Sequence, residues 1–254
     1  MGALSLLLLT CGMFLGMLFL VNMGHRLGLR SSAKYGEGKV RGNVVDGAIF
    51  GLLSLLIAFS FNGALSRLDT HRRLIADEVN AIGTVWNRID LLPKAAVPQL
   101  RQTMREYVKS RIDVYDAKLD PRSEPAVRSA RLRHALWQQT MSACPPATCP
   151  SPALMLFVNA LDSLFAFPTQ QALMARMHPP DIVFGALYGL ALMCSFLVGY
   201  DMAGLRTRIW RYAFAFPITM TAILWLILDV EYPRLGTNRL NELEQLLRAL
   251  LATL

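Results

Sequence analysis

Apolar residues gather in four blocks along the chain, and each block is long enough to cross a lipid bilayer. A hydrocarbon core of about 30 Å requires roughly 20 apolar residues of α-helix. Ionisable residues inside the blocks lie only near the block ends, where a charge is less unfavourable than at mid-membrane. The pattern predicts four transmembrane helices, at about residues 3–24, 43–66, 181–200 and 212–230.

The second block runs without a break into a charged segment, residues 67–90, which reads RLDTHRRLIADEVNAIGTVWNRID. No proline lies between residues 44 and 92, so we expect a single helix roughly 70 Å long, more than twice the hydrocarbon thickness. We call residues 67–92 the arm. One face of the arm is apolar at the spacing of a seam that packs on other helices: Leu68, Ile75, Val79, Ile82, Trp86 and Ile89.

A second face of the arm is polar. Arg73 and Asp77 are four residues apart on this face and can form an ion pair. A stripe of this kind is typical of a solvated surface, and the functional alternative is the wall of a water-filled vestibule. Its residues are Arg73, Asp77, Asn80, Thr84 and Asn87.

The rest of the chain also has a helical pattern, which predicts an all-α membrane protein in four parts. Residues 1–66 form the first two transmembrane helices with a basic connecting loop, and residues 67–180 form an extramembrane helical domain. Residues 181–230 form the third and fourth transmembrane helices. Residues 231–254 form an amphipathic helix that packs on the helical domain or lies on the membrane surface.

The formal net charge of +8 follows from basic residues beside the predicted spans. This placement is typical of topology signals and lipid headgroup contact, and no nucleic-acid-binding motif accompanies it. The positive-inside rule, applied to the short loops 24–42 and 201–211, places them in the cytoplasm and the long helical domain on the opposite side. Cys144 and Cys149 lie in that domain and form either a small disulfide-closed loop in an oxidising compartment or two free thiols.

Residue patterns of known catalytic sites are absent from the sequence. The four histidines have no metal-ligand spacing, and there is neither a glycine-rich phosphate loop nor a nucleophile elbow. We therefore expect no enzymatic activity, no catalytic residue, no cofactor and no metal site.

Glycines spaced four residues apart occur in three of the predicted spans. Such pairs let helix backbones approach closely inside a bilayer, within one chain or between chains. The pairs are Gly12 and Gly16, Gly47 and Gly51, and Gly185 and Gly189.

The second span carries an apolar ridge of residues one helical turn apart: Leu53, Ile57, Phe61 and Leu65. Such a ridge is typical of a lipid-facing or core surface. Repeated around a symmetry axis, it would instead form a narrow hydrophobic neck that gates by dewetting.

Three segments resemble the bestrophin-like family of bacterial membrane proteins, which is grouped with the bestrophin anion channels. They are residues 51–93, 158–180 and 228–236, and the first contains EVNAIGT from Glu78 to Thr84. The resemblance implies a homopentamer with four spans per subunit in the bacterial inner membrane. It also implies that the second span lines the pore and continues into a vestibule. Asp229 and Glu231 are too sparse to match the calcium-binding cluster of animal bestrophins.

These features favour a homo-oligomeric ion channel with a pore neck on the second span, in which anions such as chloride are slightly favoured. The alternative is a non-conducting membrane scaffold or sensor that binds a partner through its helical domain. A transporter is less supported, because no span shows a broken helix around a polar mid-membrane site.

Overall fold

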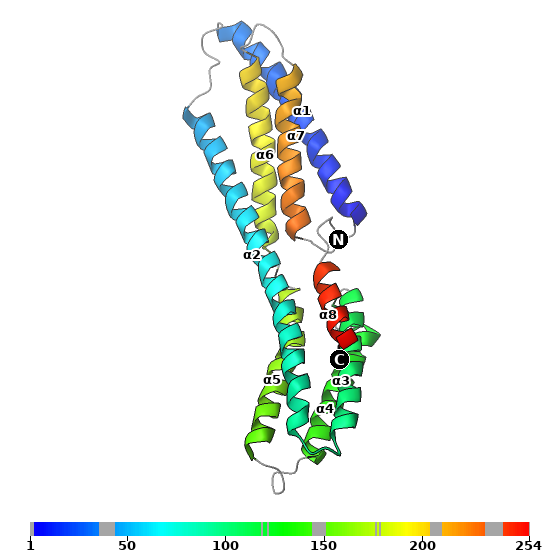
Figure 1. Ribbon diagram of the computed structural model, residues 1–254. Helices are drawn as coiled ribbons and strands as arrows, with labels where there is room; N and C mark the ends of the chain where they lie inside the picture. The colour runs from blue at the N-terminus through cyan, green and yellow to red at the C-terminus, as the bar shows by residue number, and fades with distance from the viewer. Residues whose placement is uncertain are drawn as a thin grey trace. The chain divides into compact units, whose positions relative to one another are not determined.

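The computed structural model describes residues 3–35, 44–117, 119–120, 122–143, 151–175, 177, 179–203, 210–231 and 241–253. Within these residues all regular structure is helical, as predicted (Figure 1). The elements are α1 (Ala3–Tyr35), α2 (Val44–Arg88), the 3₁₀ turn η1 (Ile89–Leu91), α3 (Val97–Asp116), α4 (Glu124–Ala143), α5 (Ser151–Met174), α6 (Asp181–Met202), α7 (Trp210–Glu231) and α8 (Asn241–Thr253).

The chain divides into two compact units. The first unit comprises Met1–Leu68 and Pro179–Asn238, and the second comprises Asp69–His178 and Arg239–Leu254. Helix α2 contributes residues to both, because it runs for 45 residues without interruption. The continuous helix expected from the sequence is therefore confirmed.

In the first unit, α1 packs along α6 and also contacts α7 (Figure 1). The apolar core of this unit draws on α1, α2, α6 and α7. Its buried members are Met17, Leu53, Leu187, Ala191, Cys194, Leu224 and Ile227.

Glycines bring α1 and α6 into close contact. A Cβ on Gly199 would lie 2.0 Å from the Val21 carbonyl oxygen, and a Cβ on Gly24 would lie 2.1 Å from the Phe196 carbonyl oxygen. Real Cβ atoms do not lie so close to a carbonyl oxygen. The backbones of α1 and α6 can therefore approach this closely only because Gly24 and Gly199 have no side chain. Gly28 belongs to the same contact, 2.6 Å from the Tyr200 carbonyl oxygen by the same measure.

In the second unit, the apolar seam of the arm packs into a core built with η1, α3, α4, α5 and α8. Ile75, Ile82 and Ile89 are buried there, and Val79 and Trp86 pack against them. Helix α8 joins the same core through Leu247, and Arg248 forms an exposed ion pair with Asp116 of α3. Packing of the seam on other helices is thus confirmed.

Among the described residues, five helices have the length and composition to cross a membrane, whereas the sequence predicts four. The additional one is Pro152–Met174 in α5, and its mean hydropathy of 1.3 is lower than the 1.9 to 2.2 of the other four. Its apolar content also serves the core of the second unit, where Phe157, Leu161 and Leu164 are buried. The count of four spans stays a prediction.

Candidate functional site

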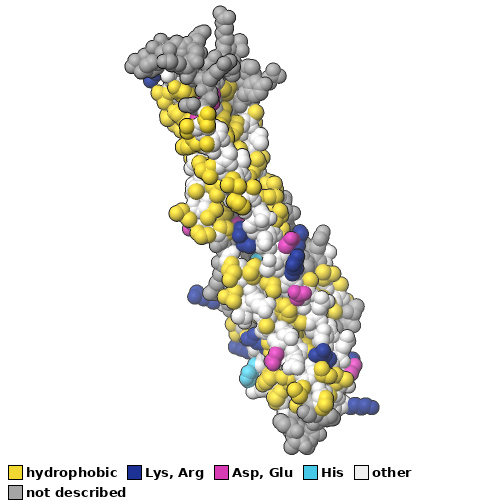
Figure 2. Space-filling model, turned by 90° about the vertical axis from the view of Figure 1, so that its left-hand side faces the viewer, with side chains coloured by type: hydrophobic (Ala, Val, Ile, Leu, Met, Phe, Trp, Pro, Cys, Tyr) yellow, Lys and Arg dark blue, Asp and Glu magenta, His cyan; other side chains and the backbone are white. Residues whose placement is uncertain are grey.

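Helix α2 is the candidate functional element because it has two chemically different halves on one axis. Its first half belongs to the apolar span and its second half to the arm. In Figure 2, hydrophobic side chains dominate the surface of the first unit, and charged side chains appear on that of the second. The question for function is which face of α2 the chain itself covers.

The ridge predicted as a pore neck faces mostly into the subunit. Leu53 is 1% exposed and belongs to the core of the first unit, and Ile57 and Phe61 pack against the same core. Leu65 alone in this ridge is largely exposed, at 38%. Leu53 thus fills the core of the subunit, and its role in a neck stays a prediction.

The opposite face of α2 is open. Leu55 and Phe59 are 52% and 65% exposed, and Gly51 lies one turn before them on the same face. Small and polar residues share this face: Ala48, Ser54, Ala58 and Asn62 are exposed. A helix face that contacts lipid tails does not require small or polar residues. Small residues are typical of surfaces on which further helices pack.

The polar stripe of the arm continues this exposed face. All five predicted members, Arg73, Asp77, Asn80, Thr84 and Asn87, are exposed. Thr84 donates its hydroxyl hydrogen bond to the Asn80 carbonyl oxygen at 2.9 Å. Arg73 and Asp77 form no ion pair with each other among the described contacts.

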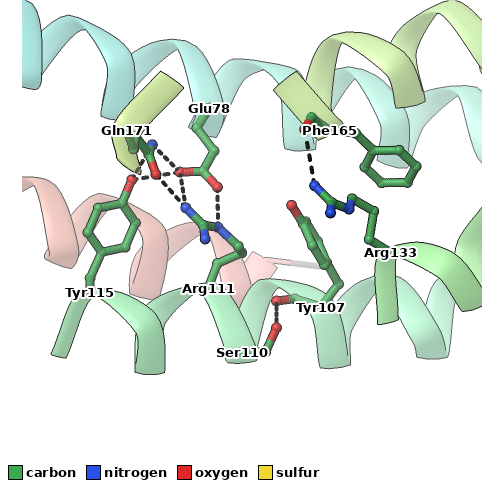
Figure 3. A network of polar contacts seen from close by, with 8 residues as sticks. All are labelled: Glu78, Tyr107, Ser110, Arg111, Tyr115, Arg133, Phe165 and Gln171. Carbon is green, nitrogen blue, oxygen red and sulfur yellow. Dashed lines mark hydrogen bonds and ion pairs between the residues drawn. The ribbon is translucent and has the colours of Figure 1, made fainter. Parts of the chain in front are cut away.

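Glu78 differs from the rest of the predicted vestibule set, because it is fully buried behind the stripe. Arg111 of α3 donates from Nε to its Oε1 at 2.6 Å and from Nη2 to its Oε2 at 3.4 Å. Tyr115 donates to Oε2 at 2.6 Å, and Gln171 of α5 donates to the same oxygen at 2.8 Å (Figure 3). Glu78 therefore ties α2 to α3 and α5 and does not face solvent.

The electrostatics of this network favour the ion pair. Burial lowers the pKa of Arg111, but the charge of Glu78 and its hydrogen bond outweigh burial, so that pKa is raised overall. Burial and the Glu78 charge both raise the pKa of Tyr115, which keeps its proton and remains a donor. We call Glu78, Arg111, Tyr115 and Gln171 the buried network.

A second ion pair joins α2 to α7 inside the first unit. Arg67 donates from Nε to Glu231 at 3.0 Å, and the Glu231 side chain is 1% exposed. The sequence places Glu231 beside Asp229 in a pair of acidic residues too sparse for a calcium-binding cluster. In the structure Glu231 forms an ion pair with Arg67. Among the described residues, no group of three or more His, Cys, Asp and Glu side chains could hold a metal ion.

The predicted glycine pairs are mostly open in the subunit. A Cβ on Gly16 would meet a Leu192 side chain at 3.4 Å. A Cβ on any of the other five predicted glycines would meet no described atom within 4 Å: Gly12, Gly47, Gly51, Gly185 and Gly189. The close contact inside the chain uses Gly24, Gly28 and Gly199 instead. The four-residue spacing of Gly24 and Gly28 is a sequence signal for this contact. Gly24 is the last residue of the predicted span and Gly28 lies beyond it, so the pair does not stand out as a contact within the membrane. Cys144 and Cys149 lie outside the described residues.

Comparisons with known proteins agree with this architecture. A variant of a bacterial Bestrophin homolog from Klebsiella pneumoniae has 15% sequence identity and a TM-score of 0.69, with 93% of this chain and 98% of that chain covered. A second variant of that homolog has 14% identity and a TM-score of 0.65, with 94% and 99% covered. A structure described as a membrane protein has 15% identity and a TM-score of 0.67, with 94% and 98% covered.

These structural likenesses show a shared fold. No curated protein matches the chain. The Bestrophin-like domain, however, matches residues 42–243, which is most of the sequence and includes all of α2. The resemblance inferred from EVNAIGT and its flanking segments is thereby confirmed. The chain belongs to the bestrophin-like family.

Proposed function

We propose that this chain is a subunit of a homo-oligomeric ion channel in which α2 lines the pore. The observation that carries the proposal is the lack of cover on α2. Only 6% of the residues in its most apolar window are buried within the chain, against 17% to 39% in the other candidate spans. Together with the small residues on this face, that openness supports packing of further subunits around it.

The neck of the proposed pore lies on the exposed face. Leu55 and Phe59 are one helical turn apart and open on the subunit surface, so a ring of copies would present them to a common axis. They replace Leu53, Ile57 and Phe61, which pack toward the subunit core. A ring of such apolar side chains is a constriction that gates by dewetting.

The polar stripe forms the wider, wet part of the proposed pore. Its two exposed charges are balanced, because Asp77 opposes Arg73. Local charge on this face therefore does not select the sign of the permeant ion. We propose anions, and chloride among them, on the strength of the family's grouping with anion channels.

The assembly we propose is a pentamer in the bacterial inner membrane, with the helical domain outside the cytoplasm. Cross-linking of the purified protein would count the subunits. A variant without the four native cysteines that carries Asn87→Cys would report orientation, because a membrane-impermeant maleimide should label it in intact cells. Labelling only after cell breakage would reverse the orientation.

The decisive experiment measures currents across a planar bilayer that contains the purified protein in asymmetric potassium chloride. The reversal potential should follow chloride. Phe59→Ala should raise single-channel conductance, and the matched control Phe61→Ala, two residues away on the inward face, should not. An increase for Phe61→Ala and none for Phe59→Ala would restore the original ridge as the neck. If an intact protein conducts no current at either polarity of the applied voltage, the scaffold alternative is favoured.

A further inference from the structure

The second unit contains a pocket away from the exposed face of α2. Its volume is about 270 Å³, and its walls come from α3, the turn after it, α4 and α5. Six of its eleven lining residues are apolar, among them Val114, Leu119 and Pro168. The volume lies just below the usual range for small-molecule sites, roughly 300 to 1,000 Å³, so an occupant would be small.

Two guanidinium groups reach this pocket from different helices. Arg111 uses Nε and Nη2 for the buried network, and its Nη1 has no hydrogen-bond partner among the described residues. Arg133 of α4 has one long hydrogen bond, from Nη1 to the Phe165 carbonyl oxygen at 3.4 Å, and its guanidinium lies 5.9 Å from the centre of the Phe165 ring. It has no carboxylate partner within the described part of the chain. Both groups therefore keep hydrogen-bond donors to spare.

Tyr107 does not line the pocket, but its hydroxyl is a further donor near these two guanidinium groups. Its side chain is fully buried, and its hydroxyl has no hydrogen-bond partner among the residues that the structure describes. Figure 3 shows this hydroxyl directed between the guanidinium groups of Arg111 and Arg133, and both charges act on it. Burial raises the pKa of Tyr107, so the hydroxyl stays protonated and can donate.

The charges around the pocket are not balanced. Glu78 is committed to Arg111, and Asp120 at the rim is exposed and accepts a hydrogen bond from the Arg122 backbone N–H at 2.9 Å. Arg133 thus lacks a buried counter-charge among the described groups. A buried donor without a partner is unfavourable, and among the described residues around these two arginines the Tyr107 hydroxyl is such a donor. Arg133 is only partly buried, and an anion with acceptor oxygens would accept from its spare donors as well.

We propose that this pocket binds a small organic carboxylate with a short apolar body. The planar fork of arginine matches a carboxylate in a bidentate manner, and the apolar walls suit a short hydrocarbon chain. The site is separate from the proposed pore face. Arg111 lines the pocket and also forms the ion pair with Glu78 of α2. An occupant that binds Arg111 would therefore affect the contact between α3 and α2.

Isothermal titration calorimetry of the detergent-solubilised protein with butyrate tests this site without measuring any current, so it can fail or succeed independently of the channel proposal. Butyrate should bind, and butyramide, which has the same size and no charge, should bind at least about tenfold more weakly because it forms no charged hydrogen bond. Equal binding of the two compounds, or no butyrate binding at millimolar concentration, would overturn the proposal.

Arg133→Gln should weaken butyrate binding about tenfold or more. The matched control is Arg131→Gln, which changes an exposed residue of the same helix outside the pocket and should bind as the wild type does. Ala172→Leu fills the pocket without changing charge and should abolish binding. Thermal unfolding of each variant checks that it is folded. Wild-type affinity in folded Arg133→Gln or in folded Ala172→Leu would place butyrate elsewhere and refute the proposal.

Discussion

Replacing Arg111 by methionine tests how firmly the second unit holds α2. The substitution keeps an unbranched, apolar side chain of similar length and removes the positive charge beside Glu78. The carboxylate is fully buried, so it would be left with two neutral donors, Tyr115 and Gln171. Removing one partner of a buried ion pair destabilises a protein by about 3 to 5 kcal/mol.

An exposed ion pair in the same unit provides the matched control. Arg248 and Asp116 lie 3.3 Å apart, with side chains 58% and 50% exposed. Pairs of this kind contribute about 0 to 1 kcal/mol, so Arg248→Met should change the free energy of unfolding little. The difference between the two variants is therefore expected to be at least about 2 kcal/mol.

A double variant distinguishes two effects of Arg111→Met: loss of the ion pair, and burial of the Glu78 carboxylate without a positive charge beside it. Arg111→Met combined with Glu78→Leu leaves no buried charge, and Tyr115 and Gln171 keep their own 2.6 Å hydrogen bond. The double variant should therefore be more stable than Arg111→Met alone. Equilibrium unfolding in mixed micelles with increasing SDS, followed by circular dichroism, measures five proteins: the wild type, Arg111→Met, Glu78→Leu, the double variant and Arg248→Met. The reasoning is refuted if Arg111→Met loses no more stability than Arg248→Met, or if the double variant loses the sum of both single effects.

Three further outcomes are expected. Gly199→Ala places a Cβ 2.0 Å from the Val21 carbonyl oxygen and should lower stability by about 1 to 3 kcal/mol or more, whereas Gly189→Ala meets nothing within 4 Å and should leave stability equal or higher in the same unfolding assay. Arg67→Gln removes the Arg67 charge from the buried Glu231 carboxylate and should lower the thermal unfolding temperature; no change would show that this pair is dispensable. The raised pKa of Tyr107 gives stability that is present below about pH 10 and lost as the pH rises further, so Tyr107→Phe should lose less unfolding free energy between about pH 9 and pH 11 than the wild type does.

The helical architecture was accessible from the sequence because it rests on local patterns. An apolar block without internal charge predicts a membrane helix, and the absence of proline between residues 44 and 92 predicts that α2 continues. The seam of the arm was also readable, since Ile75, Ile82 and Ile89 recur at the spacing that buries one helix face. These signals need no knowledge of what lies across the contact.

The sequence did not show which face of the apolar half of α2 packs on the subunit core. Leu53 and Leu55 are identical side chains two residues apart, yet one is 1% and the other 52% exposed. A helix that is apolar all round has no polar face to mark its outside, and core, lipid and a dewetted neck all favour the same side chains. Only the packing of α6 and α7 against Leu53 distinguishes the two faces.

The buried network was out of reach for a different reason. Glu78 is bonded to Arg111 and Gln171, which lie 33 and 93 residues further along the chain. Single charged residues on amphipathic helices are usually solvated, so neither partner stands out by type or spacing. Folding brings them together, and the sequence alone carries no periodic signal for such a contact.

The pitch of α2 decides which of its side chains its exposed apolar face presents at each angle around the axis. Successive residues on it are about 100° apart, so residues three apart differ by about 60° around the axis. A turn of that size would bring Ala58 to the angular position of Leu55 and would exchange a bulky side chain for a small one.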